Sequence, residues 1–255
     1  MTEQLKVTGM VVSAMPIGEY DKRLVLLTTR FGKITAFSRG SRRPKSSMLA
    51  ATEPFVFGEF ILIPGRDAYT LVGADISNYF MELREDLNAA CYGFYFLEFA
   101  SYYARENIDG TPLLKLLYQT LRVLCKKVID FRLVRRIFEL KTLVLEGEYP
   151  QCYSCCLCGS KEKLSGFSFS RCGVVCENCR RQESGFTSLH PSTVYTMQYI
   201  VSSTVEKLYT FTVHLQVLKD LEKVMEFYLK LHIDRHFKSL EMLEILGNSS
   251  ASREW

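Results

Sequence analysis

The chain has 255 residues, of which 47% are hydrophobic and 24% are charged, and its net charge is +4. This composition fits a soluble globular protein, and the length allows one large domain or two modest ones. No run of about 18 apolar residues is present, which excludes a transmembrane helix. The N-terminus opens with an acidic residue and lacks an apolar run, so it is not a signal peptide, and we expect a cytosolic protein.

Positive charge is concentrated at the start of the chain. Residues 1–50 contain nine Lys or Arg against three Asp or Glu, a net charge of +6, so the rest of the chain carries −2. A basic first fifth on a nearly neutral body predicts a polyanionic partner for that end of the protein.

The first 80 residues have the pattern of a β-barrel. Five segments rich in β-branched and aromatic residues are bounded by glycine, proline or charged turns, and they predict strands at 6–13, 24–29, 33–38, 55–62 and 69–76. The segment 39–47 contains glycine, proline, serine and four cations and must be a loop. Five short strands with a long basic connection predict a closed barrel of the oligonucleotide-binding (OB) type.

Beyond residue 80 the apolar residues recur at helical spacing. We expect helices over 86–105, from Thr111 to about 127, from an Asp130 cap to Gly147, from His190, and over 213–232. The expected fold is a multidomain α+β protein. It comprises an OB barrel at 1–80, an α-helical domain at 81–247 interrupted by a cysteine-rich module at 150–186, and a flexible tail at 248–255.

Seven of the nine cysteines lie between Cys152 and Cys179, whereas Cys91 and Cys125 stand alone in apolar helical patterns. In a reducing cytosol such clustering indicates a metal site. Two C-x-x-C pairs can supply four thiolates to one tetrahedral ion and leave no open position, which predicts a structural zinc ribbon. Its expected ligands are Cys155, Cys158, Cys176 and Cys179.

The register of the first pair has an alternative. Cys152-x-x-Cys155 is an equally good local pair, which would change the ligand set and leave other thiols spare. We prefer Cys155 with Cys158 because Gly159 follows it and suits the tight turn at a metal-binding knuckle. A redox role for a C-x-x-C pair is disfavoured, since no thioredoxin-like βαβ pattern surrounds it.

Cations and aromatic residues alternate around the third predicted strand. Single-stranded nucleic acid needs cations along its phosphates and flat side chains under its bases, and Phe31 and Phe37 supply the latter. In the alternative interpretation Phe37 is a core residue and the loop is only a solvated turn. The predicted nucleic-acid-binding residues are Arg30, Lys33, Arg39, Arg42, Arg43 and Lys45.

Catalytic motifs are absent from the sequence. There is no Walker-type or dinucleotide-binding glycine-rich loop. The four histidines do not form a nucleophile–base set, so we expect surface or core histidines and a protein that is not an enzyme.

These features together resemble the RecO family of bacterial recombination mediators. The resemblance covers nearly the whole chain. Its best points are Tyr20-Asp-Lys-Arg-Leu-Val-Leu-Leu-Thr-Thr-Arg-Phe-Gly-Lys, Ser38-Arg-Gly-Ser-Arg-Arg-Pro-Lys-Ser, the two C-x-x-C pairs, and Arg235-His-Phe-Lys-Ser.

The resemblance implies a function in DNA repair and recombination. Proteins of this family bind single- and double-stranded DNA, anneal complementary strands, and act with RecR to load RecA onto strands coated by single-strand binding protein. It implies a cytoplasmic protein that joins the nucleoid during repair. The acidic tail of single-strand binding protein would bind the helical domain, with Arg235 and Lys238 as candidate contacts. In the alternative, these two charges only complement a helix macrodipole.

Three other classes of function share some of these features. A barrel with a zinc ribbon could bind RNA, and a preference for the 2′-hydroxyl would reveal it. An interaction scaffold could use the charged loop on acidic proteins and would have negligible affinity for DNA. A zinc or thiol enzyme would need an open metal position or a labile disulfide, and the four-cysteine set argues against it.

Overall fold

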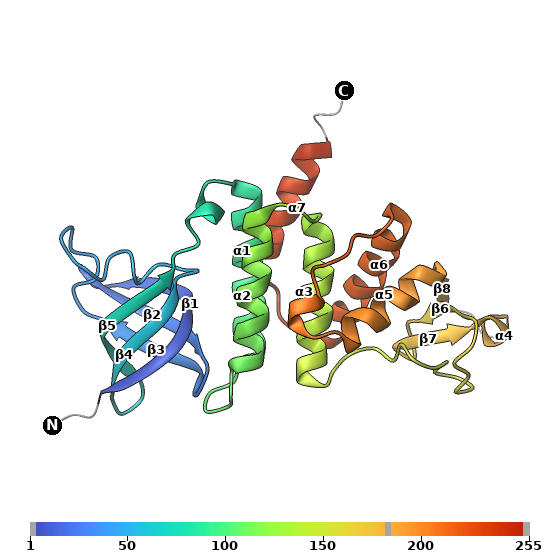
Figure 1. The fold of residues 1–255 in the computed structure, drawn as a ribbon, viewed down its shortest axis with the longest axis horizontal. Helices are drawn as coiled ribbons and strands as arrows, with labels where there is room; N and C mark the ends of the chain where they lie inside the picture. The colour runs from blue at the N-terminus through green and yellow to red at the C-terminus, as the bar shows by residue number, and fades with distance from the viewer. Residues whose placement is uncertain (1–3, 182–184, 252–255) are drawn as a thin grey trace. The chain divides into compact units, whose positions relative to one another are not determined.

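The computed structural model describes residues 4–181 and 185–251 (Figure 1). The chain divides into two compact units. The first comprises Met1–Lys126 and Phe237–Trp255, and the second comprises Lys127–His236. Among the described residues, no helix has the length and apolar character needed to cross a membrane.

The first unit begins with a closed five-stranded barrel, as predicted. Its strands are β1 (Leu5–Ile17), β2 (Asp21–Thr28), β3 (Gly32–Ser38), β4 (Phe57–Pro64) and β5 (Tyr69–Asn78), in the order β1-β2-β3-β5-β4. Within the barrel, β3 and β5 are paired in parallel and the other strand pairs are antiparallel. Because β1 has 13 residues and a bulge between Val11 and Ser13, it bends and pairs with both β4 and β2, which closes the barrel.

The barrel interior is filled by the alternate residues that the strand pattern predicts. These side chains are aliphatic or aromatic and are buried: Val7, Val11, Leu24, Leu26, Ile34, Ala36, Phe60, Leu62 and Leu71. β4 begins at Phe57, two residues later than predicted, because Phe55 has a φ of 75° and leaves the strand path. The ring of Phe55 packs on that of Phe94 instead, with the two ring centroids 4.7 Å apart.

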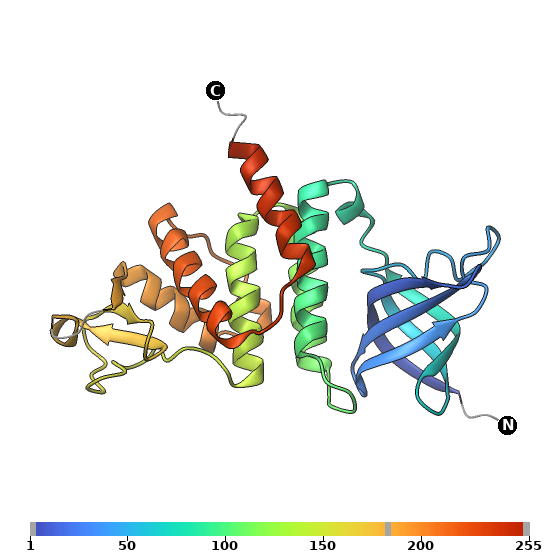
Figure 2. The same cartoon turned by 180° about the vertical axis from the view of Figure 1, so that it is seen from behind.

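Three helices complete the first unit: α1 (Leu87–Tyr103), α2 (Thr111–Lys126) and α7 (Lys238–Ala251), with a short 3-10 helix at Met81–Arg84. The carboxylate of Glu98 on α1 accepts hydrogen bonds from the amide and hydroxyl of Ser239 at the start of α7. Figure 2 shows α7 beside α1. α7 continues four residues into the segment 248–255 predicted as a flexible tail, and residues 252–255 lie outside the described part.

The second unit contains α3 (Phe131–Glu146), α5 (Pro191–Ser202), α6 (Leu215–His232) and a 3-10 turn at Val205–Lys207. Asp130 caps α3 and Gly147 ends it with a φ of 76°, as expected from the sequence. The buried ammonium of Lys141 donates to three carbonyls at the end of α5, at 2.6 to 3.2 Å, and so satisfies groups that the helix leaves unpaired.

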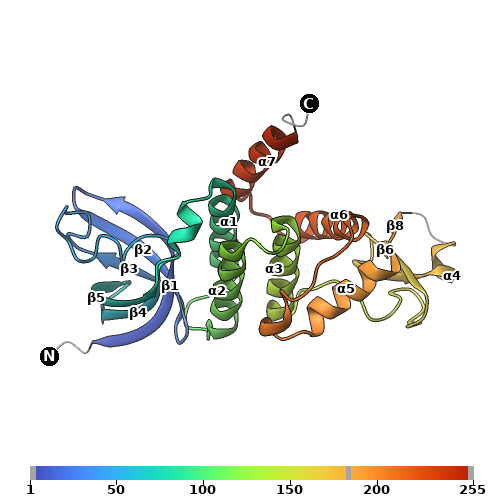
Figure 3. The ribbon, with the colours of Figure 1, turned by 45° about the horizontal axis from the view of Figure 1, so that its top comes forward.

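The cysteine-rich part of the second unit is a small sheet. Its strands β6 (Leu164–Ser168), β7 (Gly173–Cys176) and β8 (Phe186–Ser188) pair antiparallel in the order β7-β6-β8. A short helix, α4 (Glu177–Arg180), follows β7 (Figure 3). The hairpin β6–β7 is the one expected between the two C-x-x-C pairs, and it brings those pairs to the same end of the sheet.

Candidate metal centre and nucleic-acid surface

Four cysteines of the second unit meet at one point. The Sγ atoms of Cys155, Cys158, Cys176 and Cys179 all lie within 4.8 Å of one another. The Sγ atoms of Cys158 and Cys176 are 3.7 Å apart. A tetrahedron with metal–sulfur bonds of about 2.3 Å has sulfurs about 3.8 Å apart, so this spacing suits four-thiolate coordination.

A tight turn places the first pair of sulfurs. The amide of Cys155 donates to the carbonyl of Ser160 at 2.7 Å, and the amide of Gly159 donates to the carbonyl of Cys155 at 2.9 Å. Gly159 has a φ of 77°, a left-handed conformation that strains residues with a Cβ. Gly159, which follows Cys158, therefore allows the chain to form this turn without strain.

The electrostatics of the four sulfurs favour a bound cation. Burial raises the pKa of the Cys155 thiol, but hydrogen bonds from the backbone amides of Cys158, Cys176 and Leu157 outweigh burial and lower the pKa to about 6. Hydrogen bonds with the thiols of Cys158 and Cys176 raise the pKa of Cys179. Because four thiolates at this spacing repel one another, the set fits a metal ion that binds the deprotonated sulfurs.

The other cysteines of this segment have places outside the cluster. Cys152 is completely buried, which raises the pKa of its thiol to about 12, and its carbonyl accepts from the Gln198 side chain. The amide of Cys156 donates to Val174, and Cys172 lies in the β6–β7 turn with a φ of 51°. Of the two possible registers, the structure thus assembles the pair of Cys155 and Cys158.

The predicted DNA-binding cations fall at two ends of the β2–β3 hairpin. Arg30 lies in the turn that joins β2 to β3, and Lys33 is the second residue of β3. The other four cations follow the last residue of β3. Since β3 has seven residues, these two groups are about 20 Å apart and do not form one cluster.

The cations at the hairpin turn are partly used by the fold. The ammonium of Lys33 donates to the carbonyl of Ser101 at 2.8 Å, near the end of α1. The guanidinium of Arg30 lies 5.8 Å from the ring centroid of Phe31. Phe31 itself is partly buried against the barrel core, and its ring centroid lies 6.4 Å from that of Tyr69, so its ring is less accessible than that of Phe37.

The basic loop at the other end, residues 39–56, is tied to the barrel at both of its sides. Arg42 donates from Nη1 to the carbonyls of Gly18 and Glu19, at 3.3 and 3.2 Å. Lys22 is buried and donates to Thr52 (3.1 Å) and to Glu53 (2.6 Å). These contacts hold the loop against β2, and they leave the side chains of its other cations exposed: Arg39, Arg43 and Lys45.

An apolar and basic row lies on the outer face of the barrel beside this loop. Strand pairing places Met15 opposite Arg23, and Arg23 opposite Phe37. Met15 is 57% exposed and Phe37 is 38% exposed, while Arg23 is also exposed. The alternative interpretation of Phe37 as a core residue is therefore wrong, because the strand alternation turns its ring to the outside of the barrel.

Three residues of this surface, Met15, Arg23 and Tyr20, are missing from the sequence prediction. Arg23 lies in the row, and Tyr20 lies beneath the guanidinium of Arg43, 5.3 Å from its ring centroid. Counting outward from the tight turn after Thr28 pairs Arg23 with Phe37, so the hairpin register was the signal that could have identified it. The contact between Tyr20 and the loop depends on tertiary structure and has no such signal.

The candidate partner contacts Arg235 and Lys238 are both exposed, but they belong to different units. Between them, Phe237 is buried and packs on the aromatic rings of Tyr95 and Phe99. Lys238 is the first residue of α7, where the helix macrodipole is positive. The interpretation that Lys238 complements the macrodipole is therefore wrong, because it lies at the opposite end of the helix from the one that favours a cation.

Two family profiles match the chain. The profile described as "Recombination protein O N terminal" matches residues 1–80, and the profile described as "Recombination protein O C terminal" matches residues 84–241. The chain belongs to the RecO family. The C-terminal RecO profile begins just after the barrel, so it includes helices α1 and α2 of the first unit as well as the whole second unit.

Relatives of this RecO chain are similar over almost their whole length. A protein of Acetivibrio thermocellus is 31% identical over 95% of this chain and 97% of its own length. A protein of Alkaliphilus metalliredigens is 33% identical over 93% of this chain and 98% of its own length. A third protein, from a Thermoanaerobacter species, is 29% identical over 96% of this chain and 98% of its own length. All three carry the name DNA repair protein RecO.

Proposed function

We propose that this RecO-family protein is a DNA repair and recombination mediator that works without catalysis. It binds single- and double-stranded DNA, anneals complementary strands and, with RecR, helps to load RecA onto strands coated by single-strand binding protein. The observation that carries the proposal is the exposed row of Met15, Arg23 and Phe37 beside an anchored basic loop. The proposal is supported by the relatives, which carry the name DNA repair protein RecO.

The residues of the barrel have distinct proposed roles. Arg23, Arg39 and Lys45 contact phosphates, together with Arg43, and the exposed ring of Phe37 stacks on a base. Lys33 and Arg42 position the surface, because their side chains are hydrogen-bonded to the protein's own carbonyls. Arg30 extends the positive potential to the other end of the hairpin.

Annealing follows from charge neutralisation. Each phosphate that a cation neutralises releases a counterion, so DNA affinity falls steeply as salt rises. A surface that holds two backbones and stacks only a few bases reduces the repulsion between the strands and leaves most base edges free to pair. The exchange makes and breaks no covalent bond.

We propose that zinc is the metal held by the four cysteines and that it stabilises the module. Four sulfurs fill a tetrahedral ion and leave no position for water or substrate. The proposed protein partners are RecR and the acidic tail of single-strand binding protein, with Arg235 and Lys238 as contacts for the carboxylates of that tail. The proposed location is the cytoplasm, at the nucleoid during repair.

The decisive experiment mixes the protein with two complementary oligonucleotides, each coated with the cognate single-strand binding protein, and follows duplex formation at increasing salt. We expect rapid annealing that is lost at high salt. Replacing Arg39 and Lys45 with Glu should abolish it and reduce the salt slope of DNA binding. The control carries the same change of charge on α2, Arg122→Glu with Lys126→Glu, and should anneal normally.

Four results would contradict the proposal. DNA binding without annealing would indicate a plain nucleic-acid module, and preference for RNA of the same sequence would indicate an RNA-binding protein. The absence of any DNA binding would indicate an interaction scaffold. Equal loss of annealing in the α2 control would show that net charge, rather than the basic loop, accounts for the effect.

A further inference from the structure

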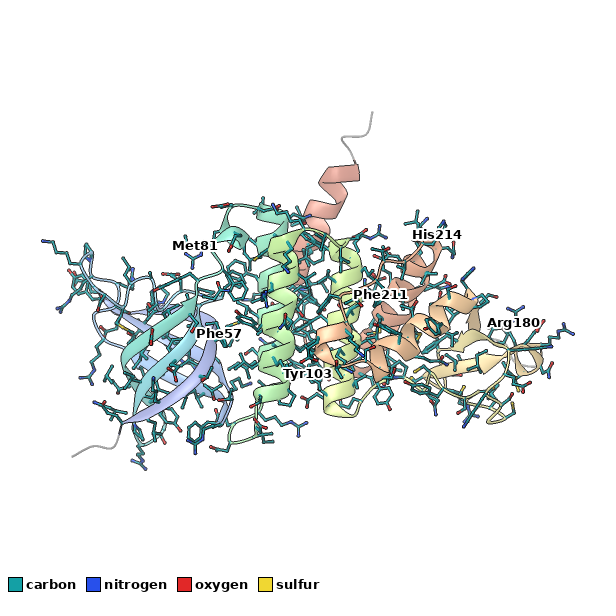
Figure 4. All side chains as sticks on the ribbon, viewed as in Figure 1. Phe57, Met81, Tyr103, Arg180, Phe211 and His214 are labelled. Atoms are coloured by element: carbon teal, nitrogen blue, oxygen red, sulfur yellow. The ribbon has the colours of Figure 1, made fainter. Side chains whose placement is uncertain are left out.

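The second unit contains a pocket of about 540 Å³ that lies apart from the cysteine cluster. It is formed by the exposed face of α5, the first turn of α6 and the segment 210–213 between them. Figure 4 labels two of its residues, Phe211 in that segment and His214 at the start of α6. Its volume is within the range of small-molecule sites.

The lining of the pocket is aromatic and carries no formal charge. Tyr195, Tyr199 and Phe211 supply three rings, and no Lys, Arg, Asp or Glu is among the residues that line the pocket. The rings of Tyr199 and Phe211 meet edge to face, with their centroids 5.1 Å apart, whereas Tyr195 is 68% exposed. Such a lining favours an uncharged flat ligand, because it offers no Lys or Arg to form an ion pair with a phosphate or a carboxylate.

Two histidines of the pocket have a defined tautomer. Nδ1 of His190 accepts a hydrogen bond from the amide of Ser192 at 3.2 Å, and Nδ1 of His214 accepts from the amide of Gln216 at 3.4 Å. In a neutral imidazole the proton must then be on Nε2, which makes each ring a hydrogen-bond donor at its far edge.

Hydroxyl groups add to this polar edge. The hydroxyls of Ser192, Tyr195 and Thr212 have no hydrogen-bond partner among the residues that the structure describes. By contrast, the hydroxyl of Tyr199 donates to the carbonyl of Lys207 at 3.2 Å. The site therefore combines ring faces with uncommitted polar groups, which match a heterocycle with acceptors on its rim better than a hydrocarbon side chain.

We infer that this pocket binds a nucleobase. The aromatic rings would stack on its face, and the Nε2 groups of His190 and His214 would donate to its ring nitrogens or carbonyl oxygens. The inference adds a base-binding site to the proposed nucleic-acid function and uses no residue of the barrel. Binding of the base alone is independent of salt, because the pocket contributes no ion pair.

The test uses the full-length, metal-loaded protein and the histidine ring resonances in NMR. The chain has four histidines, of which His190 and His214 line the pocket and His232 and His236 do not. Titration with 2′-deoxyadenosine or thymidine, which lack phosphate, should shift the first two resonances together and leave the other two unchanged. The apparent affinity should be the same at low and high salt.

Variants connect the shifts to the pocket. Tyr195→Ala should weaken nucleoside binding about tenfold, as expected for loss of one stacking ring, and should leave the fold intact because the side chain is exposed. Tyr195→Phe should keep most of the affinity. Tyr149→Ala, at another exposed tyrosine of the same unit, is the control and should bind normally.

A second arm identifies the source of the base. A short oligothymidylate that shifts the same two histidines, when an abasic strand of equal length does not, assigns the site to a base within a strand. Shifts with nucleosides alone assign it to free nucleosides. The inference is overturned if neither ligand shifts His190 and His214, if Tyr195→Ala has no effect, or if only an apolar probe such as toluene binds. Failure here leaves annealing by the barrel unaffected, so the two proposals fail separately.

Discussion

At the scale of residues, the outward row of the barrel separates two kinds of DNA contact. Arg23 offers a charge, while Phe37 offers a ring face at the neighbouring position across the β2–β3 pair. A cation contributes to affinity through counterion release, which depends on salt, whereas a stacked ring contributes through van der Waals contact, which does not. Removing the charge should therefore change the salt dependence of DNA affinity, whereas removing the ring should lower the affinity by the same factor at every salt concentration.

We expect Phe37→Ala to weaken binding of single-stranded DNA by about 1–3 kcal/mol with an unchanged salt slope. Arg23→Gln should instead lower the slope on the same single-stranded DNA by about 0.7, the value for one lost phosphate contact. Fluorescence titrations at several salt concentrations measure both quantities. Val72→Ala, at an exposed apolar residue of β5, is the control. A reduced salt slope in the Phe37 variant would contradict the assignment.

The four-cysteine cluster predicts which single cysteine substitutions abolish metal binding. Cys158→Ser removes one of the four clustered sulfurs, so the protein should lose tight metal binding and the four-thiolate absorption spectrum with cobalt. Cys156→Ser removes a neighbouring thiol outside the cluster and should retain one metal per chain. If the Cys156 variant lost the metal instead, the ligand set proposed here would be incorrect.

At the scale of elements, the basic loop depends on one buried lysine. Lys22 on β2 holds both the hydroxyl of Thr52 and the carboxylate of Glu53, and thereby fixes the end of the loop that is far from Arg42. Breaking a charged hydrogen bond at a buried site leaves its partner without compensation. The order of the loop should therefore be sensitive to this single residue.

We expect Lys22→Met to lower the free energy of unfolding by about 1–3 kcal/mol and to increase proteolysis within residues 39–56. Denaturant unfolding and limited digestion measure the two effects. The matched control is Lys6→Met, which removes an exposed ion pair with Glu59 and should leave both unchanged. An equal change in the two variants would show that burial of Lys22 is not the cause.

The small sheet β7-β6-β8 makes a second prediction at this scale. Two of the four clustered cysteines, Cys155 and Cys176, are part of its short apolar core with Val175. Since so small a core stabilises little by itself, removing the metal with a chelator should unfold this module. NMR should show loss of the dispersed amide signals of 150–190, while those of the barrel remain. If the amide signals of the module stayed dispersed without metal, the proposed structural role of the metal would be wrong.

At the scale of the whole molecule, the barrel does not end where its sequence pattern ends. The N-terminal RecO profile covers residues 1–80, but Phe57 of the barrel lies 4.6 Å from the ring of Tyr118 on α2, and Lys33 is bonded to α1. A fragment of residues 1–80 would expose Phe55 and Phe80, both of which are buried in the full chain. It should therefore unfold at lower denaturant than the barrel within the full-length protein, as measured by hydrogen exchange of the barrel amides. Equal stability would contradict this account.

Much of the fold could be predicted from periodicity and caps. The closed barrel and its five strands followed from alternation, and α3 was predicted within a residue because Asp130 and Gly147 are strong boundary signals. The set of four clustered cysteines followed from spacing and from the turn at Gly159. The division of the six predicted cations into two groups at opposite ends of the β2–β3 hairpin was not predictable. The sequence does not show that the side chain of Lys33 contacts the end of α1. The pocket between α5 and α6 was likewise not predictable, since it depends on how segment 210–213 packs.

The discontinuous make-up of the first unit has a consequence for how the protein is made. The barrel, α1 and α2 leave the ribosome first, but α7 comes from residues 238–251 and emerges last. Until then the rings of Tyr95 and Phe99 lack their buried neighbour Phe237. We therefore expect the inserted second unit to begin folding while the first unit is still incomplete. A chain that lacks its last twenty residues would still make the barrel, α1 and α2, but the first unit would lack α7 and Phe237.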